Sequence, residues 1–343
     1  MSVGYVYDPI YIAHDHKGHP ENGARLTAIM HYLESSGFLR LLTAIPAEPA
    51  SVADLARIHS SELIEQVRYM AQSGGGHFDL DTYVNTSSYE AACYAAGGTI
   101  AATRAVLTGE VTGAFALVRP PGHHATRTMS MGFCLFNNVA VAAAWALAEG
   151  LASRVAIVDY DVHHGNGTEA AFAGDPHVLY VSTHEYPFFP WTGAQSVVNS
   201  VDIDRNHVAV NIPLPAETGD VGYRMAFDRI VEPALRRFQP DLILVSIGYD
   251  AHWADPLAWM LLSLTGYRYI ADMLVRLSRE LCQGRLVFVL EGGYDHAVLA
   301  HGVATTLSAM LDRPYDDPLG PASEPEASVD TLISQIVRSH GLE

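Results

Sequence analysis

Four short polar segments combine residue types that can bind a metal ion and transfer protons. They are RPPGHH at 119–124, DYDVHHGNGT at 159–168, GYDAHWADP at 248–256 and EGGYD at 291–295. In the Asp-x-His pair of Asp161 and His163, both side chains can point the same way after an extended segment, because strand side chains alternate with period two. With Asp250 they would give a divalent ion three protein ligands and leave one coordination position open, as in catalytic zinc sites. An ion bound in this way lowers the pKa of its water to about 7 and polarises carbonyl groups.

A tandem histidine and a tyrosine supply the other groups that hydrolysis needs. His123 and His124 would act as proton donor and acceptor beside the ion, if each has a partner that fixes its tautomer. Asp159 and Asn166 flank the metal ligands, and one carboxylate and one amide would push the pKa values of two imidazoles apart. Tyr294 follows two glycines and could donate its hydroxyl to an oxyanion opposite the metal. Each motif alone has a structural explanation, such as a turn or a chance pair among 17 histidines, but their combination favours an active site.

Buried strands are expected to carry these segments. Nearly continuous apolar runs, typical of strands covered on both faces, predict strands at Ala114–Val118, Val155–Val158, Val178–Ser182, Val208–Ile212, Leu242–Ile247 and Leu286–Leu290. Helical patterns lie between them at Asn137–Glu149, Asp220–Phe238 and Gly266–Cys282. This alternation predicts an α/β fold with a central, mostly parallel sheet flanked by helices on both faces. The polar segments follow four of the strands, so they would meet at the carboxyl edge, where such sheets bind ligands.

Composition limits the organisation and the partners of the chain. We expect one catalytic domain at residues 1–312 and an extension at 313–343 that ends in a weak helix near Ser328–Ser339. The 38 acidic residues outnumber the 20 Lys and Arg, and this charge of −18 repels nucleic acids and attracts cationic substrates. Three cysteines without a CxxC pair predict a reducing, cytoplasmic location. The N-terminus lacks a signal-peptide pattern, and the apolar run Val139–Ala148 is too short to cross a bilayer, so no membrane association is expected.

The motifs together resemble the arginase/deacetylase superfamily, and within it the zinc-dependent histone deacetylases of the class II type. This group includes bacterial histone deacetylase-like amidohydrolases and acetylpolyamine amidohydrolases. The resemblance runs from about Tyr7 to His301 and rests on RPPGHHA, GFCLFNN, DYDVHHGNGT, FFPWTG, SIGYDAHWADPL and LEGGY in the family's order. It implies a single-domain arginase/deacetylase fold and a metal-dependent amidohydrolase that releases acetate from acetylated amines, most simply acetyl-lysine side chains.

The resemblance also implies roles for individual residues. Asp161, His163 and Asp250 match the zinc ligands, with ferrous iron as the alternative ion because mixed carboxylate–imidazole sites do not choose sharply between them. His124 with Asn166 matches the general base and acid, His123 with Asp159 matches the second histidine pair, and Tyr294 matches the tyrosine that stabilises the transition state. The other matches are a substrate tunnel at Gly132, Phe133 and Phe189, a structural potassium site at Asp159, Asp161, His163, Ser182 and Thr183, and a second one at Phe172, Asp175, Val178 and Val208.

Two departures from the family pattern leave residues without a firm assignment. In the segment HPENGARL, Gly23 stands where the family usually has Pro. The family's Arg is retained as Arg25, and we assign to it only a position near the exit for acetate. The acidic residue that grips the substrate backbone at the tunnel rim is either Asp81 or Asp79, with Asp81 as our choice.

Three alternatives concern substrate and activity. Leu257 stands where polyamine-selective relatives carry an acid, which favours acetyl-lysine over acetylpolyamines, unless Glu185 or Asp204 supplies a rim carboxylate. A two-metal ureohydrolase needs a second Asp at the position of Gly248. A catalytically inactive protein that only binds acetylated ligands would lack one of the chemical groups, and all are present. The long segment Pro187–Asn206 could pack against a second copy in a homo-oligomer.

Overall fold

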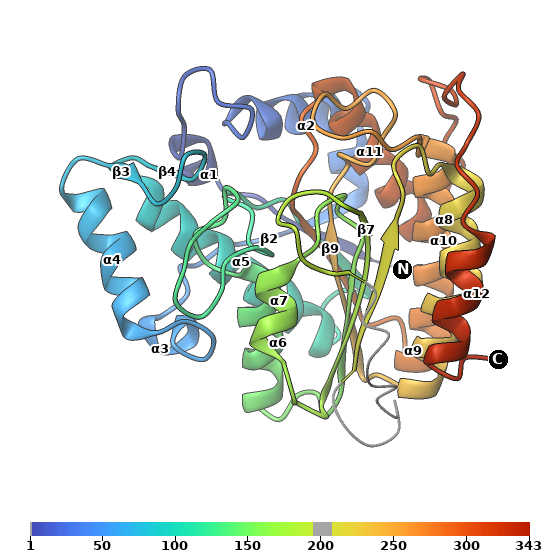
Figure 1. Cartoon of the computed structure of the whole chain (residues 1–343). Helices are drawn as coiled ribbons and strands as arrows, with labels where there is room; N and C mark the ends of the chain where they lie inside the picture. Colours follow the sequence, from blue (N-terminus) through green and yellow to red (C-terminus); the bar gives the residue numbers. More distant parts are fainter. Residues whose placement is uncertain (1, 195–207) are drawn as a thin grey trace.

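The computed structural model describes residues 2–194 and 208–343, the side chain of Val208 excepted. Eight parallel strands form one sheet in the order β2-β1-β5-β10-β9-β6-β7-β8 (Figure 1). They are β1 Val3–Val6, β2 Leu42–Ile45, β5 Gly113–Ala116, β6 Val155–Asp159, β7 Val178–Glu185, β8 Val208–Leu214, β9 Leu242–Ile247 and β10 Leu286–Leu290. A separate two-stranded antiparallel pair, β3 Gly76–His77 and β4 Tyr83–Val84, lies near the N-terminal helices.

Helices cover both faces of the sheet, so every residue of β6, β9 and β10 is buried. The helix α5 packs on α6, and on the opposite face α10 and α2 pack on α11 (Figure 1). The helices are α1 Ile10–Ala13, α2 Ala24–Ser35, α3 Val52–Leu55, α4 Ser61–Gln72, α5 Ser88–Leu107, α6 Asn138–Ala148, α7 Asn166–Ala171, α8 Asp220–Ala226, α9 Glu232–Phe238, α10 Leu264–Cys282, α11 His296–Met310 and α12 Asp330–Ser339, with a 3-10 turn η1 at Phe38–Leu41 and a π turn η2 at Phe227–Val231.

The expected fold class is confirmed, and the differences lie in the details of the elements. The predicted bounds of β9 and β10 match, whereas β7 and β8 extend beyond their apolar runs. The long helix expected at Asp220–Phe238 consists of α8 and α9, joined by the π turn η2. The strand β2 was missed because it lies at the sheet edge, where two of its four residues are exposed and its apolar pattern is weak.

The segment after residue 312 packs on the helices beside the sheet. Helix α12 buries Ile333, Ile336 and Val337 and contacts α8 and η2 (Figure 1). The carboxylate of Glu326 accepts hydrogen bonds from the Val221 and following backbone N–H groups at the start of α8. These contacts attach the extension to the helical layer beside the sheet.

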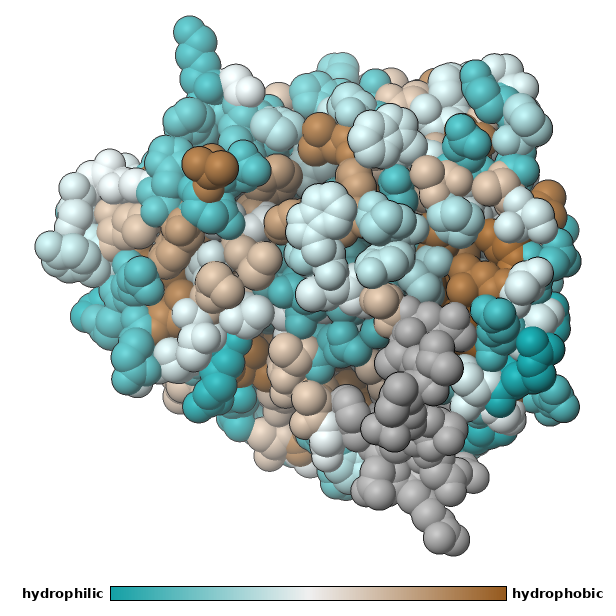
Figure 2. All heavy atoms as spheres, in the orientation of Figure 1, coloured by the Kyte–Doolittle hydropathy of each residue, from teal (hydrophilic) through white to brown (hydrophobic). Residues whose placement is uncertain are grey.

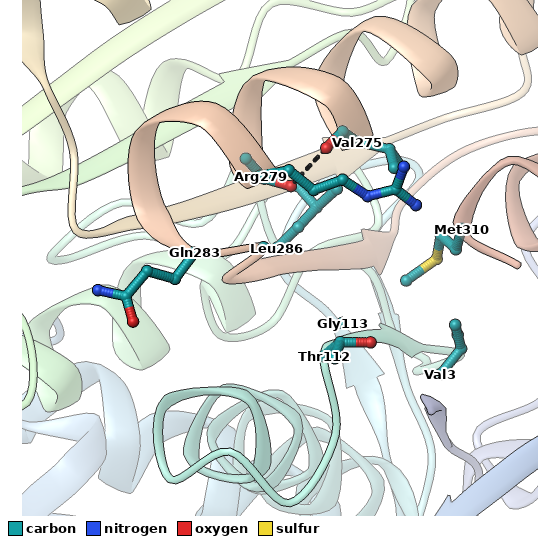
Figure 3. Close-up of a pocket in the computed structure, with 10 residues that line it drawn as sticks. Val3, Thr112, Gly113, Val275, Arg279, Gln283, Leu286 and Met310 are labelled. Carbon is teal, nitrogen blue, oxygen red and sulfur yellow. Dashed lines mark hydrogen bonds between the residues drawn. The ribbon is translucent and has the colours of Figure 1, made fainter. Parts of the chain in front are cut away.

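The described surface has small hydrophobic groups and a cavity at one edge of the sheet. Hydrophobic residues form small groups separated by hydrophilic ones on the face seen in Figure 2. A cavity of about 100 Å³ opens beside the amino ends of β1, β5 and β10 (Figure 3), the edge opposite to the four polar segments. Arg279 is the single ionisable side chain that lines it within the described part of the chain. None of the helices in the described residues combines the length and hydropathy required to cross a bilayer.

Candidate active site

The three expected metal ligands meet at the carboxyl edge of the sheet. Asp161 and His163 follow β6, and Asp250 follows the neighbouring strand β9. Nδ1 of His163 lies 3.0 Å from Oδ1 of Asp161 and 3.3 Å from Oδ2 of Asp250. One ligand atom from each residue lies within 4.8 Å of the other two. Two adjacent parallel strands therefore bring two carboxylates and one imidazole to a single point.

The hydrogen bonds of the two carboxylates leave one buried oxygen without a donor in the described part of the chain. Oδ2 of Asp161 accepts from the backbone N–H of Gly292 at 2.8 Å, and Oδ1 of Asp250 accepts from that of Val162 at 3.1 Å. Oδ2 of Asp250 is buried and has no hydrogen-bond partner among the described residues. Because a buried carboxylate oxygen without a hydrogen bond is costly, a metal ion shared by this oxygen and the nearby His163 ring fits the donor set.

The two aspartates occupy the space in which a side chain at Gly248 would begin. A Cβ atom at this position would lie 2.1 Å from Oδ2 of Asp161 and 2.5 Å from Oδ1 of Asp250. Real atoms do not approach so closely, so the two-metal ureohydrolase arrangement, which needs an Asp here, does not fit the side-chain positions of Asp161 and Asp250 in this structure.

The two histidines of the RPPGHH segment have different partners. Nδ1 of His123 lies 3.1 Å from Oδ2 of Asp159, and Nδ1 of His124 lies 2.8 Å from Oδ1 of Asn166. Asn166 is the first residue of α7, so the helix start fixes its amide beside the ring. The ring centres of the two histidines are 4.0 Å apart, and His124 lies 5.9 Å from the ring of His163.

These partners separate the pKa values of the two histidines. Burial lowers the pKa of His123, but the carboxylates of Asp159, Asp161 and Glu291 outweigh it and raise that pKa to about 10. Burial, together with the positive charge of the neighbouring His123, lowers the pKa of His124 well below its usual value. His123 is therefore a cation at neutral pH, and His124 is a neutral imidazole that can accept a proton.

A cavity of about 340 Å³ leads from the surface to the metal ligands. Phe133 and Phe189 line it, and Leu257 and Tyr294 line it from other loops. Gly132 has a φ of 56°, and a Cβ at this position would lie 2.5 Å from the ring of His124 and 2.9 Å from that of Phe189. Glycine is therefore required where the GFCLFNN turn passes between the two rings.

Comparison with known proteins identifies this arrangement. Residues 19–310 match the histone deacetylase domain. The chain belongs to the histone deacetylase family. Relatives include a probable deacetylase from Archaeoglobus fulgidus, 39% identical over 298 residues (86% of this chain and 82% of the relative), and a histone deacetylase-like amidohydrolase from Pseudomonas aeruginosa, 40% identical over 296 residues (86% and 76%). The crystal structure of the HDA15 HD domain superposes with a TM-score of 0.89 at 35% identity and covers 99% of this chain and 96% of that one. The chain therefore combines the sequence of the histone deacetylase family with the single α/β domain of that solved structure.

The acidic candidates at the rim of this deacetylase differ in their contacts. Asp79 uses Oδ1 to accept the backbone N–H groups of Asp81 and the next residue. The exposed carboxylate of Asp81 has no hydrogen bond within residues 2–194 and 208–343 and lines the cavity. The expectation for Glu185 differs from the structure, because it is 4% exposed and its carboxylate accepts the N–H of Trp259 at 3.1 Å. Asp204 lies outside the described residues, as does most of the segment Pro187–Asn206.

A buried ion cluster that sequence reasoning did not assign braces the backbone beneath Tyr294. The Glu21 carboxylate lies between Arg25 (3.0 Å) and Arg119 (2.7 Å), and all three side chains are fully buried. Arg25 also donates to two carbonyl oxygens of the 291–293 turn, at 2.6 and 2.7 Å, and its guanidinium carbon lies 5.1 Å from the ring centre of Tyr294. Burial raises the pKa of Glu21, but the two arginines outweigh it and lower that pKa to about 2. Burial also raises the pKa of the Tyr294 phenol, which keeps its proton as a donor.

Two further buried carboxylates hold the catalytic turns. Oδ2 of Asp255 accepts the N–H of Tyr294 at 2.6 Å and that of the next residue at 3.2 Å, and Oδ1 accepts the N–H of Leu257 at 3.0 Å. Glu291 accepts the N–H of His123 at 3.2 Å and that of the preceding glycine at 2.7 Å. Both acids lie inside the quoted motifs, so their types were visible in the sequence, but their distant partners were not.

The residues of the two expected potassium sites lie on β7 or on the segments beside it. Ser182 pairs with Asp159 across the β6–β7 ladder, its hydroxyl lies 2.8 Å from Nδ1 of His184, and the buried hydroxyl of Thr183 has no partner among the described residues. For the second site, the 172–178 turn is closed by backbone hydrogen bonds from Asp175 to Phe172 and from Val178 to Asp175. Val208 begins β8 opposite Leu179. Each set is close in space.

Proposed function

We propose that this protein is a zinc-dependent deacetylase that hydrolyses the acetyl amide of acetyl-lysine side chains and releases acetate. The observation that carries the proposal is the buried point where Asp161, His163 and Asp250 converge, at the closed end of an aromatic-lined tunnel. Zn²⁺ at that point, or Fe²⁺ in the cell, would supply Lewis-acid activation of water and of the acetyl carbonyl.

The side chains around this point have complementary roles. His124 is a neutral imidazole held by Asn166, so it takes a proton from the attacking water and later gives it to the leaving amine. The Tyr294 phenol keeps its proton and donates a hydrogen bond to the oxyanion of the tetrahedral intermediate. His123 remains an imidazolium beside Asp159 and stabilises negative charge that develops nearby. Two histidines of the same type thus perform different tasks because their partners differ.

The shape of the tunnel supports a linear acetylated side chain as the substrate. Phe133 and Phe189 provide apolar walls for the methylene stem, and we assign the Gly132 carbonyl as the acceptor for the amide N–H. We assign Asp81 as the rim acid, because its carboxylate is exposed there and has no hydrogen bond in the described part of the chain. Leu257 offers no charge to a distal ammonium, which favours acetyl-lysine over acetylpolyamines. The charge of −18 argues against a nucleic acid partner.

Two structural cations and a location complete the proposal. We infer K⁺ at Ser182 and Thr183 with the backbone of Asp159, Asp161 and His163, because the Thr183 hydroxyl has no partner among the described residues. A second K⁺ is proposed at the turn that contains Phe172, Asp175 and Val178, together with Val208. The three buried free cysteines are compatible with a reducing compartment, and we propose the cytoplasm.

Acetate release from an acetyl-lysine peptide tests the proposal. The purified protein should release acetate, lose activity on dialysis against a chelator and regain it with Zn²⁺ or Fe²⁺. The variant His124→Ala should lower kcat by at least about 100-fold, whereas His31→Ala, which removes an exposed histidine on α2, should not change it. Peptide binding without any acetate release by the metal-loaded protein would contradict the proposal and favour a binding protein.

A further inference from the structure

A groove lies beside the tunnel mouth and contains two exposed tryptophans. It has a volume of about 510 Å³ and shares one chain segment with the tunnel, because Leu257 lines the tunnel and Trp259 lines the groove. Trp259 is 68% exposed and Trp253 is 38% exposed. Indole rings of this size are seldom left in water without a partner, and they are frequent in binding hot spots.

The groove and the tunnel adjoin each other. The ring of Trp259 lies 5.8 Å from that of Phe188, and the next residue, Phe189, lines the tunnel. A substrate whose acetyl-lysine enters the tunnel therefore has its neighbouring residues close to Trp259.

The C-terminal extension forms one wall of the groove. Leu319, Pro321 and Glu324 line it, and the indole N–H of Trp253 donates to the carbonyl oxygen of Gly320 at 2.9 Å. The extension is thus part of a surface next to the tunnel as well as a cover for α8.

The chemistry of the groove suits a cation with a methylene stem. Glu217 and Glu324 line the same groove as Trp259, and no Lys, Arg or His occurs among the described residues that line it. Guanidinium and ammonium groups bind to indole faces and to carboxylates, and their stems cover apolar surface such as that of Met260 and Leu319. The charge of −18 adds a long-range attraction for such groups.

Glu217 is fixed in place by its backbone. Its N–H donates to the carbonyl oxygen of Trp259 at 2.7 Å, and its own carbonyl oxygen accepts the N–H of Ala327 at 2.9 Å. Its φ is 65°, a left-handed conformation that non-glycine residues adopt at a cost. The side chain therefore starts from a backbone that is ordered before any ligand binds.

We propose that this groove binds a lysine or arginine side chain that flanks the acetyl-lysine in the same peptide. The inference rests on the proposed function and names its substrate class, which is acetyl-lysine in a basic sequence. The stem would lie on Met260 and Leu319, and the cation would lie between the Trp259 ring and the carboxylates of Glu217 and Glu324.

The test compares kcat/KM for matched substrates. These are acetyl-lysine peptides with arginine or with glutamine at the flanking positions, an acetyl-lysine amide without flanking residues, and N-acetylspermidine. The wild-type protein should prefer the arginine peptide by about tenfold, mainly through KM. The double variant Glu217→Gln/Glu324→Gln should reduce this preference to about twofold or less. The control Glu34→Gln/Glu110→Gln removes two exposed carboxylates elsewhere and should keep the preference.

The outcomes test the groove proposal and the proposed deacetylase function separately. If the acetyl-lysine amide is hydrolysed but the wild-type protein shows no preference for arginine, or both double variants lose it equally, the groove proposal is wrong and the proposed function stands. If Glu217→Gln/Glu324→Gln impairs N-acetylspermidine and not the arginine peptide, the groove serves a polyamine and the proposal is overturned. If none of the four substrates is hydrolysed, the proposed function fails.

Discussion

Replacing Asn166 by Asp tests the role of His124 with little change in shape. Oδ1 of Asn166 lies 2.8 Å from Nδ1 of His124, so the variant places a negative charge at hydrogen-bond distance from the ring. The charge stabilises the imidazolium form and therefore raises the pKa of His124. Burial holds that pKa below 6.5 in the wild-type protein, so the acidic limb of its pH–rate profile should lie below neutral pH.

The size of the effect follows from the geometry. A carboxylate in contact shifts an imidazole pKa upward by about 1 to 3 units. We expect about 1 to 2 units, because Asn166 is partly exposed to solvent and its amide oxygen already lies at hydrogen-bond distance from the ring. A general base acts only when it is neutral, so the acidic limb of kcat/KM should move to higher pH by the same amount. At pH values below the midpoints of both acidic limbs, kcat/KM of Asn166→Asp should be about 10- to 100-fold lower than that of the wild-type protein.

The assay is kcat/KM for an acetyl-lysine peptide between pH 5 and 10, with the bound metal measured at each pH. Gln283→Glu serves as the control, since it adds one carboxylate at the opposite edge of the sheet, beside the cavity in Figure 3, and should leave the profile unchanged. An acidic limb of Asn166→Asp at or below that of the wild-type protein, with full metal content, would refute His124 as the base.

The remaining predictions concern the metal, the oxyanion, the rim and the ion cluster. Asp161→Ala should abolish metal binding and turnover together, and stoichiometric metal in this variant by mass spectrometry would contradict the ligand assignment. Tyr294→Phe should lower kcat by about 100- to 1000-fold with little change in the free energy of unfolding, and a near-normal kcat would remove the tyrosine from the oxyanion role. Leu257→Glu should shift the kcat/KM ratio toward N-acetylspermidine by about tenfold, because it adds a partner for the distal ammonium, and an unchanged ratio would mean that this position does not select substrates. Glu21→Gln should lower the free energy of unfolding by about 3 kcal/mol at pH 7, measured by urea denaturation. Since the folded pKa of Glu21 is about 2 against 4.5 in the unfolded chain, this contribution is present above pH 4.5 and is lost as the pH falls toward 2, so the variant should lose less stability than the wild-type protein on acidification to pH 3.5.

The sequence contains enough information for the core of the sheet and for the centre of the site. Two predicted strands, Leu242–Ile247 and Leu286–Leu290, are together apolar at every position but one, which is typical of strands buried on both faces. Their bounds match those of β9 and β10. The meeting of Asp161, His163 and Asp250 could be anticipated because these residues closely follow such strands. The position of each ligand is then set by the common edge of a parallel sheet.

The parts that escaped prediction depend on contacts between distant segments. Glu21 and Arg119 meet across 98 positions, and Arg25 reaches the carbonyl of Gly293 across 268. No local pattern marks such partners, since a single charged residue in a short motif is equally typical of an exposed turn. The π turn at Phe227–Val231 was missed for a related reason, because its apolar spacing continues that of a regular helix.

The place of β10 in the sheet has a consequence for biosynthesis. The strand is encoded near the end of the chain but lies between β5 and β9, so it joins β2-β1-β5 to β9-β6-β7-β8. A ribosome therefore releases two half-sheets with open edges before it delivers the strand that closes them, and such late, long-range pairing is slow. Until Leu290 has left the exit tunnel, the open edges of β5 and β9 can pair with other chains. A product terminated before this strand would also lack Tyr294, to which we assign the oxyanion role, so we expect it to have no partial activity.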